Sequence, residues 1–194
     1  DGLEEDRKAC KQKIYDFNQL PPSRQSKEAP QMIKNIFGKT GENVWVEAPF
    51  HCDYGWNIEV GENFYSNYNL TILDVGKVTC GKNVQIAPNV SIYTAGHPVH
   101  PDSRNSGYEY GIPVTVGDNV WIGGNTVILP GVTVGSNVVI GAGSVVSKDI
   151  PDNTIAAGNP CKVIRKITDE DRIYYFKKQK FDDEAWEEVK NKNK

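Results

Sequence analysis

Aliphatic residues recur at every sixth position through much of the chain. The first block holds Val78, Val84 and Val90, and the second, four steps of six further on, holds Val114, Val120, Thr126, Val132, Val138, Ser144, Ile150 and Ala156. A second aliphatic residue follows most of these positions by two, and a residue with little or no side chain often comes next. Hexapeptide periodicity is typical of a parallel β-helix, in which each repeat forms one face of a coil. The pattern therefore predicts a mostly β fold of triangular coils.

An earlier series has the same period but is offset by two residues. Its members are Val46, Cys52, Ile58, Phe64 and Leu70. Leu70 and Val78 are eight residues apart, which predicts a two-residue insertion between Asp74 and Lys77. Three six-residue faces make a coil of about 18 residues, so we expect roughly five to six coils.

The period is interrupted over the 17 residues from His97 to Pro113. This segment contains Pro98, Pro101, Gly107 and Gly111 and has no aliphatic repeat, which predicts a loop extruded from the coil. Long loops on a rigid scaffold commonly carry function.

The two ends of the chain lack the six-residue repeat and have the residue pattern of helices. Residues 3 to about 38 show apolar positions at helical spacing, broken by Pro21-Pro22. After Pro160 the apolar and charged residues predict a C-terminal helix that begins at Thr168 and frays from Lys190. We therefore expect an N-terminal helical segment (1–40), a β-helix domain (41–165) with its loop (97–113), and a C-terminal helix and tail (166–194).

Composition excludes several function classes. The 194 residues carry a net charge of −3, which argues against electrostatic binding to nucleic acid. No apolar run reaches the roughly 20 residues of a membrane span, and no signal-peptide pattern opens the sequence. The four cysteines lack metal-ligand spacing and are expected to be reduced thiols. These features predict a cytoplasmic protein that binds neither nucleic acid nor membranes.

Histidine is the residue most suited to acid–base chemistry here, and the chain has three. His97 and His100 stand at the root of the predicted loop, where either side chain could act as a general base or be an ordinary surface residue. A metal site is less favoured, because a catalytic zinc usually takes three protein ligands and no third one has suitable spacing.

Polar residues that could lie near these histidines are also typical of β-helix corners. They are Asp53, Asn67, Asn69, Asp74 and Glu109. Asp74 precedes His97 by a little more than one coil, so the two could be stacked neighbours. The glycine-rich segment 140–144 is not a phosphate-binding P-loop, because no Gly-Lys-Ser/Thr follows it. Lys148, Lys162, Arg165 and Lys166 form either a solvated face or a site for a phosphate-bearing ligand.

Seven short motifs, in order, resemble a known family. They are Asn63-Phe64-Tyr65, Asn69 to Asp74, Ile86 to Val90, Gly96 to His100, Val120 to Gly123, Gly141 to Val146 and Ala157 to Cys161. Together they resemble the maltose/galactoside O-acetyltransferase group of the hexapeptide acyltransferases. The resemblance runs from about Asp1 to the C-terminal helix. It implies a left-handed β-helix and a homotrimer with active sites between subunits, which moves acetyl from acetyl-CoA to a sugar hydroxyl.

The resemblance also implies a role for individual residues. His97 matches the general base, Asn67 the residue that stabilises the oxyanion, and Glu109 a loop residue near the histidine. Asp53 matches a position that contacts the acceptor, and Asn67 and Asp74 are expected to bind the acceptor as well. The positions that match the coenzyme A site are Trp121, Gly124, Ala142, Ser147, Lys148, Lys162 and Arg165. The reaction implied needs no metal.

Two departures leave the acceptor open. Val75 stands where one galactoside-type member has a second Asp, and the family's acidic residue from the N-terminal segment precedes the start of this sequence. The alternatives are a hexapeptide acetyltransferase for an amino-sugar or non-sugar acceptor, a non-catalytic β-helix scaffold, and a carbonic-anhydrase-like β-helix. The last needs three zinc histidines, and His51 is far upstream of the other two.

Overall fold

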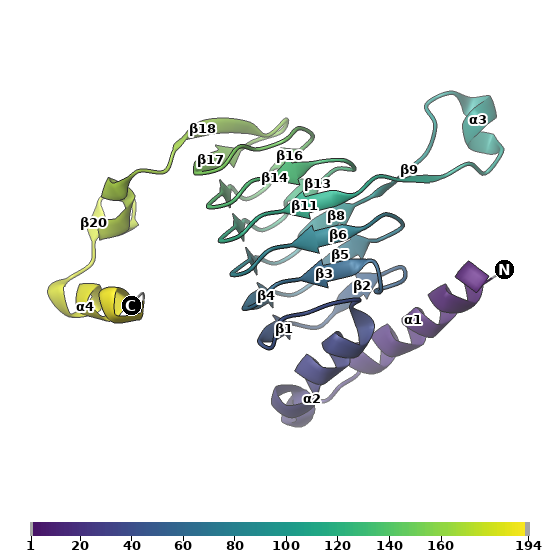
Figure 1. Ribbon diagram of the computed structural model, residues 1–194, viewed down its shortest axis with the longest axis horizontal. Coiled ribbons are helices and arrows are strands. Elements are labelled where there is room, and N and C mark those ends of the chain that lie inside the picture. Colours follow the sequence, from purple (N-terminus) through teal and green to yellow (C-terminus); the bar gives the residue numbers. More distant parts are fainter. Residues whose placement is uncertain (1, 193–194) are drawn as a thin grey trace.

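The protein is a parallel β-helix with two helices at one end and an appendage at the other (Figure 1). The computed structural model describes residues 2–192. Helices α1 (Gly2–Asn18) and α2 (Pro22–Ile36) cover the first coil. They contribute Ile14, Phe17 and Ile33 to the same core that fills the coils. The two helices therefore close the end of the β-helix, where its apolar interior would otherwise meet water.

Three parallel sheets form the three faces of the coils. The first face contains β1 (Val44–Val46), β4 (Phe64–Ser66), β7 (Gln85–Ile86), β12 (Trp121–Ile122), β15 (Val139–Ile140) and β17 (Thr154–Ala157). The second face contains β2 (Phe50–Cys52), β5 (Leu70–Leu73), β8 (Ser91–Tyr93), β13 (Val127–Ile128) and β16 (Val145–Val146). The third face contains β3 (Ile58–Val60), β6 (Val78–Cys80), β11 (Val114–Val116) and β14 (Thr133–Val134).

The interior of the coil is a column of side chains, and the six-residue period places the inward-facing residues of each strand in it. Val84, Ile86, Val120, Ile122 and Ile140 are all buried, as expected for aliphatic residues at the repeating positions. Alternate residues of a strand point to opposite sides, so the residue between two aliphatic ones faces outward, as Thr79 does between Val78 and Cys80.

Asparagine and glycine have different tasks at the corners. Asn63, Asn83 and Asn119 adopt positive φ angles, which asparagine tolerates better than most residues. Glycines such as Gly61 are instead required because there is no room for a side chain. A Cβ at Gly61 would lie 2.7 Å from the backbone carbonyl carbon of Gly81 in the next coil. Stacked coils therefore exclude larger side chains at these positions.

The early coils contain 20 residues, the later ones 18 and the last one 16. Val44 pairs with Phe64, whereas Thr115 pairs with Thr133. The predicted insertion between Asp74 and Lys77 is present, but a second one, between Cys52 and Ile58, was not predicted. Val46 and Cys52 are the second inward residues of their strands, so the earlier series mixed two phases. The insertion was missed because Cys52, the second inward residue of β2, is also six residues before Ile58, the first inward residue of β3.

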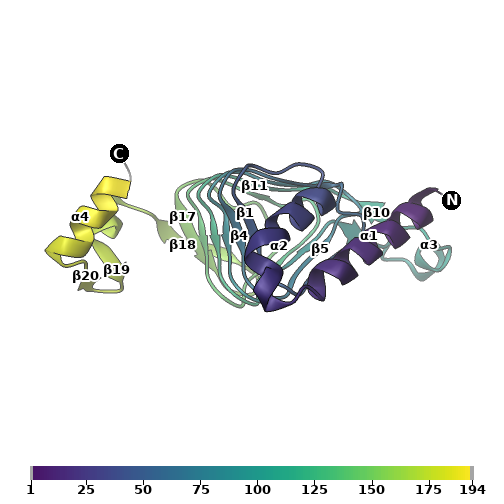
Figure 2. The ribbon, with the colours of Figure 1, turned by 90° about the horizontal axis from the view of Figure 1, so that it is seen from below.

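Both insertions and the loop 97–113 leave the coil at the same corner, between the second and third faces. Each follows a strand of the second face, β2, β5 or β8, and precedes a strand of the third. In the loop, β9 (Ala95–Gly96) pairs antiparallel with β10 (Tyr110–Gly111), and α3 (Pro101–Asn105) lies at its tip. The loop and the N-terminal end of α1 project on one side of the coil, and the appendage on the other (Figure 2).

The C-terminal helix exists, but it does not begin at Thr168. The chain first forms β18 (Lys162–Lys166), antiparallel to β17, and Thr168 then precedes the 3-10 helix η1 (Asp169–Ile173). A short hairpin of β19 (Tyr174–Phe176) and β20 (Gln179–Lys180) follows, and α4 spans Asp183–Lys192. The aromatic run Tyr174–Phe176 favours a strand over a helix, which the apolar spacing alone did not reveal.

Candidate active site

The hairpin of β9 and β10 brings two chemically active side chains together. His97 directly follows β9 and Glu109 directly precedes β10, so strand pairing places them side by side. His97 Nε2 lies 3.9 Å from Glu109 Oε1. The imidazole is about half exposed, at 52%. A base with a carboxylate beside it therefore stands open to a substrate at the root of the loop.

A backbone carbonyl fixes the tautomer of His97. Its Nδ1 lies 3.1 Å from the carbonyl oxygen of Tyr108. A carbonyl can only accept a hydrogen bond, so Nδ1 carries the proton and the neutral ring keeps its lone pair on Nε2. Nε2 is thus the atom able to receive a proton, with Glu109 placed to stabilise the imidazolium that results.

His100 is arranged differently. Its Nδ1 accepts a hydrogen bond from the Asp102 amide at 3.2 Å, and the residue caps the N-terminus of α3. The side chain is 69% exposed. The structure therefore separates the two loop histidines, because His100 serves the loop's own fold while His97 offers its free nitrogen to the surroundings.

Asp74 is buried and holds the neighbouring insertion in place. Its Oδ1 accepts from the amides of Asp53 (2.8 Å) and Tyr54 (3.0 Å), and its Oδ2 from that of Gly55 (2.7 Å). Burial raises the pKa of Asp74, and these hydrogen bonds act in the opposite direction. The carboxylate is fully occupied by backbone groups and has no exposed surface. Its geometry is that of a positioning residue for Asp53.

Asp53 forms an ion pair with Arg7, which sequence analysis did not single out. Arg7 Nη2 lies 2.5 Å from Asp53 Oδ1. The hydrogen bond to Asp53 raises the pKa of Arg7, and the charge of Glu109 adds to this effect. Helix α1 thus places a cation against Asp53, within electrostatic reach of Glu109 in the loop. Helical periodicity could not reveal this ion pair, because in the sequence Arg7 occupies an ordinary exposed position of a helix.

Asn67 lies at the other end of the second face, and Trp121 lies on the neighbouring first face. Asn67 follows β4, and its Oδ1 accepts from the Tyr68 amide at 2.8 Å, so its side-chain N–H groups are the donors it can offer. Trp121 stands on the outer side of the first face and is 55% exposed. A face of five to six residues separates this corner from His97, on the order of 15–20 Å. One chain therefore does not bring Asn67 and His97 together.

The predicted coenzyme residues are also divided between two corners. Gly124 and Ala142 stack at the corner of the first and second faces. Lys162 of β18 lies at the same corner, because it pairs with Ala157 at the end of β17. Ser147 and Lys148 follow β16, at the corner that carries His97. Arg165 already forms a two-pronged ion pair with Asp171, at 2.7 and 2.8 Å, although both remain partly exposed.

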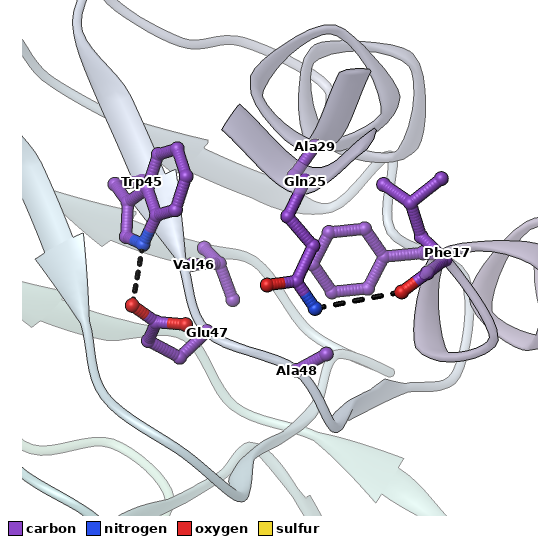
Figure 3. Close-up of a pocket in the computed structure, with 8 residues that line it drawn as sticks. Phe17, Gln25, Ala29, Trp45, Val46, Glu47 and Ala48 are labelled. Carbon is purple, nitrogen blue, oxygen red and sulfur yellow. Dashed lines mark hydrogen bonds between the residues drawn. The ribbon is translucent and has the colours of Figure 1, made fainter. Parts of the chain in front are cut away.

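The pocket between α2 and β1 is too small to be a substrate site. It has a volume of about 10 Å³ and is lined by Phe17, Gln25 and Trp45, among others (Figure 3). Such a space accommodates about one water molecule. Among residues 2–192, no group of three or more His, Cys, Asp or Glu side chains could hold a metal ion. No helix within the same range is long and apolar enough to cross a membrane.

Two family models match this sequence. Residues 113–148 match the model described as "Bacterial transferase hexapeptide (six repeats)", which defines the class as a hexapeptide transferase. Residues 1–41 match the "Maltose acetyltransferase hexapeptide capping motif", which corresponds to α1, α2 and the start of the first coil.

Individual relatives give the same result. The galactoside O-acetyltransferase of Escherichia coli is 53% identical over 180 residues, which cover 93% of this chain and 88% of the relative. A solved galactoside acetyltransferase in complex with coenzyme A has a TM-score of 0.91 at 53% identity and covers 94% of this chain and 90% of its own. A solved maltose O-acetyltransferase from Clostridium difficile has a TM-score of 0.84 at 53% identity, with coverage of 86% and 89%. The chain belongs to the maltose/galactoside O-acetyltransferase group of the hexapeptide acyltransferases.

Replacement of Asp74 by Asn should destabilise the protein. One amide oxygen cannot replace both carboxylate oxygens, and the new NH2 group would face a backbone N–H. We expect the free energy of unfolding to fall by about 1–3 kcal/mol in urea titrations at fixed protein concentration. Asp118→Asn is the matched control, because Asp118 is only partly buried and accepts from a single amide, that of Lys82. Equal losses in the two variants would contradict the positioning role of Asp74.

Proposed function

We propose that this protein transfers the acetyl group of acetyl-CoA to a hydroxyl group of a sugar, with His97 as the general base. The observation that carries the proposal is the contact of His97 Nδ1 with the Tyr108 carbonyl, which leaves Nε2 free to take a proton beside Glu109. A hydroxyl is a weak nucleophile until a positioned base accepts its proton, and such a base contributes typically about 10²–10⁴-fold to the rate.

The reaction proceeds through a tetrahedral intermediate. His97 Nε2 takes the hydroxyl proton as the sugar oxygen attacks the thioester carbonyl carbon. The carbonyl oxygen becomes an oxyanion, to which the side-chain N–H of Asn67 donates a hydrogen bond. As the intermediate collapses, the carbon–sulfur bond breaks and the departing thiolate takes the proton from His97. The products are the acetyl ester and free coenzyme A, and the base is restored.

The active site is formed between subunits of a homotrimer. His97 of one subunit and Asn67 of the next act on the same substrate, because within one chain they lie at opposite ends of the second face. The division of the coenzyme residues between the same two corners supports this arrangement. In a cyclic trimer each interface joins two different surfaces, so three equivalent sites result.

The coenzyme lies along the corner of small residues. Gly124 and Ala142 keep this surface low, so that an extended pantetheine arm can approach the backbone, with Trp121 beside it. Ser147, Lys148 and Lys162 supply hydrogen-bond donors for its carbonyl and phosphate groups. Arg165 contributes to phosphate binding within its pair with Asp171, since a guanidinium has five donors.

The acceptor lies at the Asp53 corner. The Asp53 carboxylate accepts hydrogen bonds from sugar hydroxyls, and Arg7 donates to their oxygens. Asp74 holds the backbone on which Asp53 stands.

His97→Ala should lower kcat by about 10²–10⁴-fold, because the proton acceptor is lost while the coenzyme surface remains. The measurement is steady-state release of free thiol from acetyl-CoA, with coenzyme binding followed by titration calorimetry. His100→Ala is the control and should have a mild effect, because its nitrogen is occupied by the Asp102 amide. A fully active His97→Ala enzyme would assign the reaction to another base.

Asp53→Asn should raise KM for the sugar more than KM for acetyl-CoA. The substitution keeps the size of the side chain but removes an acceptor-only group and the charge that pairs with Arg7. Both constants are obtained from kinetics with each substrate varied in turn. If neither constant changes, Asp53 is a corner residue without contact to the acceptor.

Two inactive variants should complement each other. Coexpression of His97→Ala and Asn67→Ala chains produces mixed trimers in which some sites receive an intact His97 from one chain and an intact Asn67 from its neighbour. Random mixing would restore about a quarter of the sites. The control is expression of each variant by itself, without wild-type protein. An absence of recovery in trimers shown by mass spectrometry to be mixed would place both residues in the same chain's site.

A further inference from the structure

Two free thiols meet where α1 packs against the coil. Cys10 lies on α1 and Cys52 ends β2, and their Sγ atoms are 3.7 Å apart. Both side chains are buried. The other two cysteines occupy different surroundings, since Cys80 lies inside the third face and Cys161 packs beside Ser144.

We propose that Cys10 and Cys52 form a site of reversible oxidation, at which a disulfide bond ties α1 to the coil. A disulfide has a sulfur–sulfur distance of about 2.05 Å, so the gap must close by about 1.6 Å. A rotation of the side chains with a small shift of α1 supplies this movement. The bond would join elements 42 residues apart in the sequence.

The two sulfurs are chemically unequal. The hydrogen bond with Cys52 lowers the pKa of Cys10, with a smaller contribution in the same direction from Lys13, while burial opposes them. The same contact raises the pKa of Cys52. Cys10 is therefore the thiolate that attacks an oxidant, and Cys52 is the thiol that resolves the product.

With a peroxide as the oxidant, the chemistry balances in two steps. The Cys10 thiolate attacks one oxygen of hydrogen peroxide and becomes a sulfenic acid, and the hydroxide that leaves takes a proton to form water. Cys52 then attacks the sulfenic sulfur, and its proton leaves with the hydroxyl group as a second water molecule. Each sulfur is oxidised by one electron and each peroxide oxygen is reduced by one.

The position of the pair gives the bond a structural consequence. Residues 2–9 of α1 are exposed, so Cys10 is the first buried residue of the helix. Arg7 lies one turn before it, and Asp53 directly follows Cys52. A disulfide would therefore anchor α1 covalently, and it would do so beside the Arg7–Asp53 ion pair.

The test exposes the reduced full-length protein to hydrogen peroxide, and separately to oxidised glutathione, and maps its cysteines by mass spectrometry. Trypsin cleaves after Lys and Arg, so the bond would join peptide 9–11 to peptide 40–77, each of which contains one cysteine. We expect this linked pair in most of the protein, with Tm raised by about 5 °C or more and restored by dithiothreitol.

Cys10→Ser and Cys52→Ser should each abolish the linked pair and the rise in Tm, while Cys161→Ser should behave like the wild type. The peptide map of the wild-type protein decides the proposal even if a variant fails to fold. The proposal is overturned if neither oxidant produces the linked pair, if Cys10 is oxidised to a sulfinic acid without linkage, or if Cys80 or Cys161 forms the disulfide instead.

Discussion

Each coil of this protein must hydrogen-bond to the coils above and below it along all three faces. Residues in a strand cannot be added without shifting the register of every later strand, and a shift by one would turn aliphatic side chains outward. Extra residues are therefore tolerated only at the corners. In this chain the insertions at Asp53–Asn57 and Asp74–Lys77 and the loop 97–113 all occupy the same corner. The regularity of the coil thus gathers its irregular, polar segments in one place.

The gathered segments depend on each other. Buried Asp74 holds the amides of the preceding insertion, which places Asp53 against Arg7 of α1. A buried carboxylate is costly unless its oxygens are hydrogen-bonded, and three backbone amides meet that need here. The corner therefore combines a buried carboxylate that stabilises the fold with the Arg7–Asp53 ion pair, whose guanidinium remains partly exposed. The contact between the free thiols of Cys10 and Cys52 lies next to these segments, where α1 packs against β2.

Within a single chain, the candidate site residues lie at two separate corners of the coil. His97 and Glu109 stand at one corner, and Asn67, Gly124 and Ala142 stand at another. A rigid triangular coil cannot fold to bring two of its corners together. Association of identical coils can do so, because it sets one corner of a chain against a different corner of its neighbour.

The sequence by itself determined the β-helix, its inward residues and the loop, because a six-residue period leaves few other ways to bury aliphatic side chains. Val84, Ile86 and Val120 lie where the period places them. It also identified His97 as a candidate base, and the family resemblance selected it over His100. Only the tertiary structure revealed the insertion after Cys52, the role of Asp74 as a buried anchor, and the Arg7–Asp53 pair. It also showed that Thr168 precedes a 3-10 helix. These features arise from contacts between residues distant in the sequence, or from competition between local structures, and neither leaves a periodic signal.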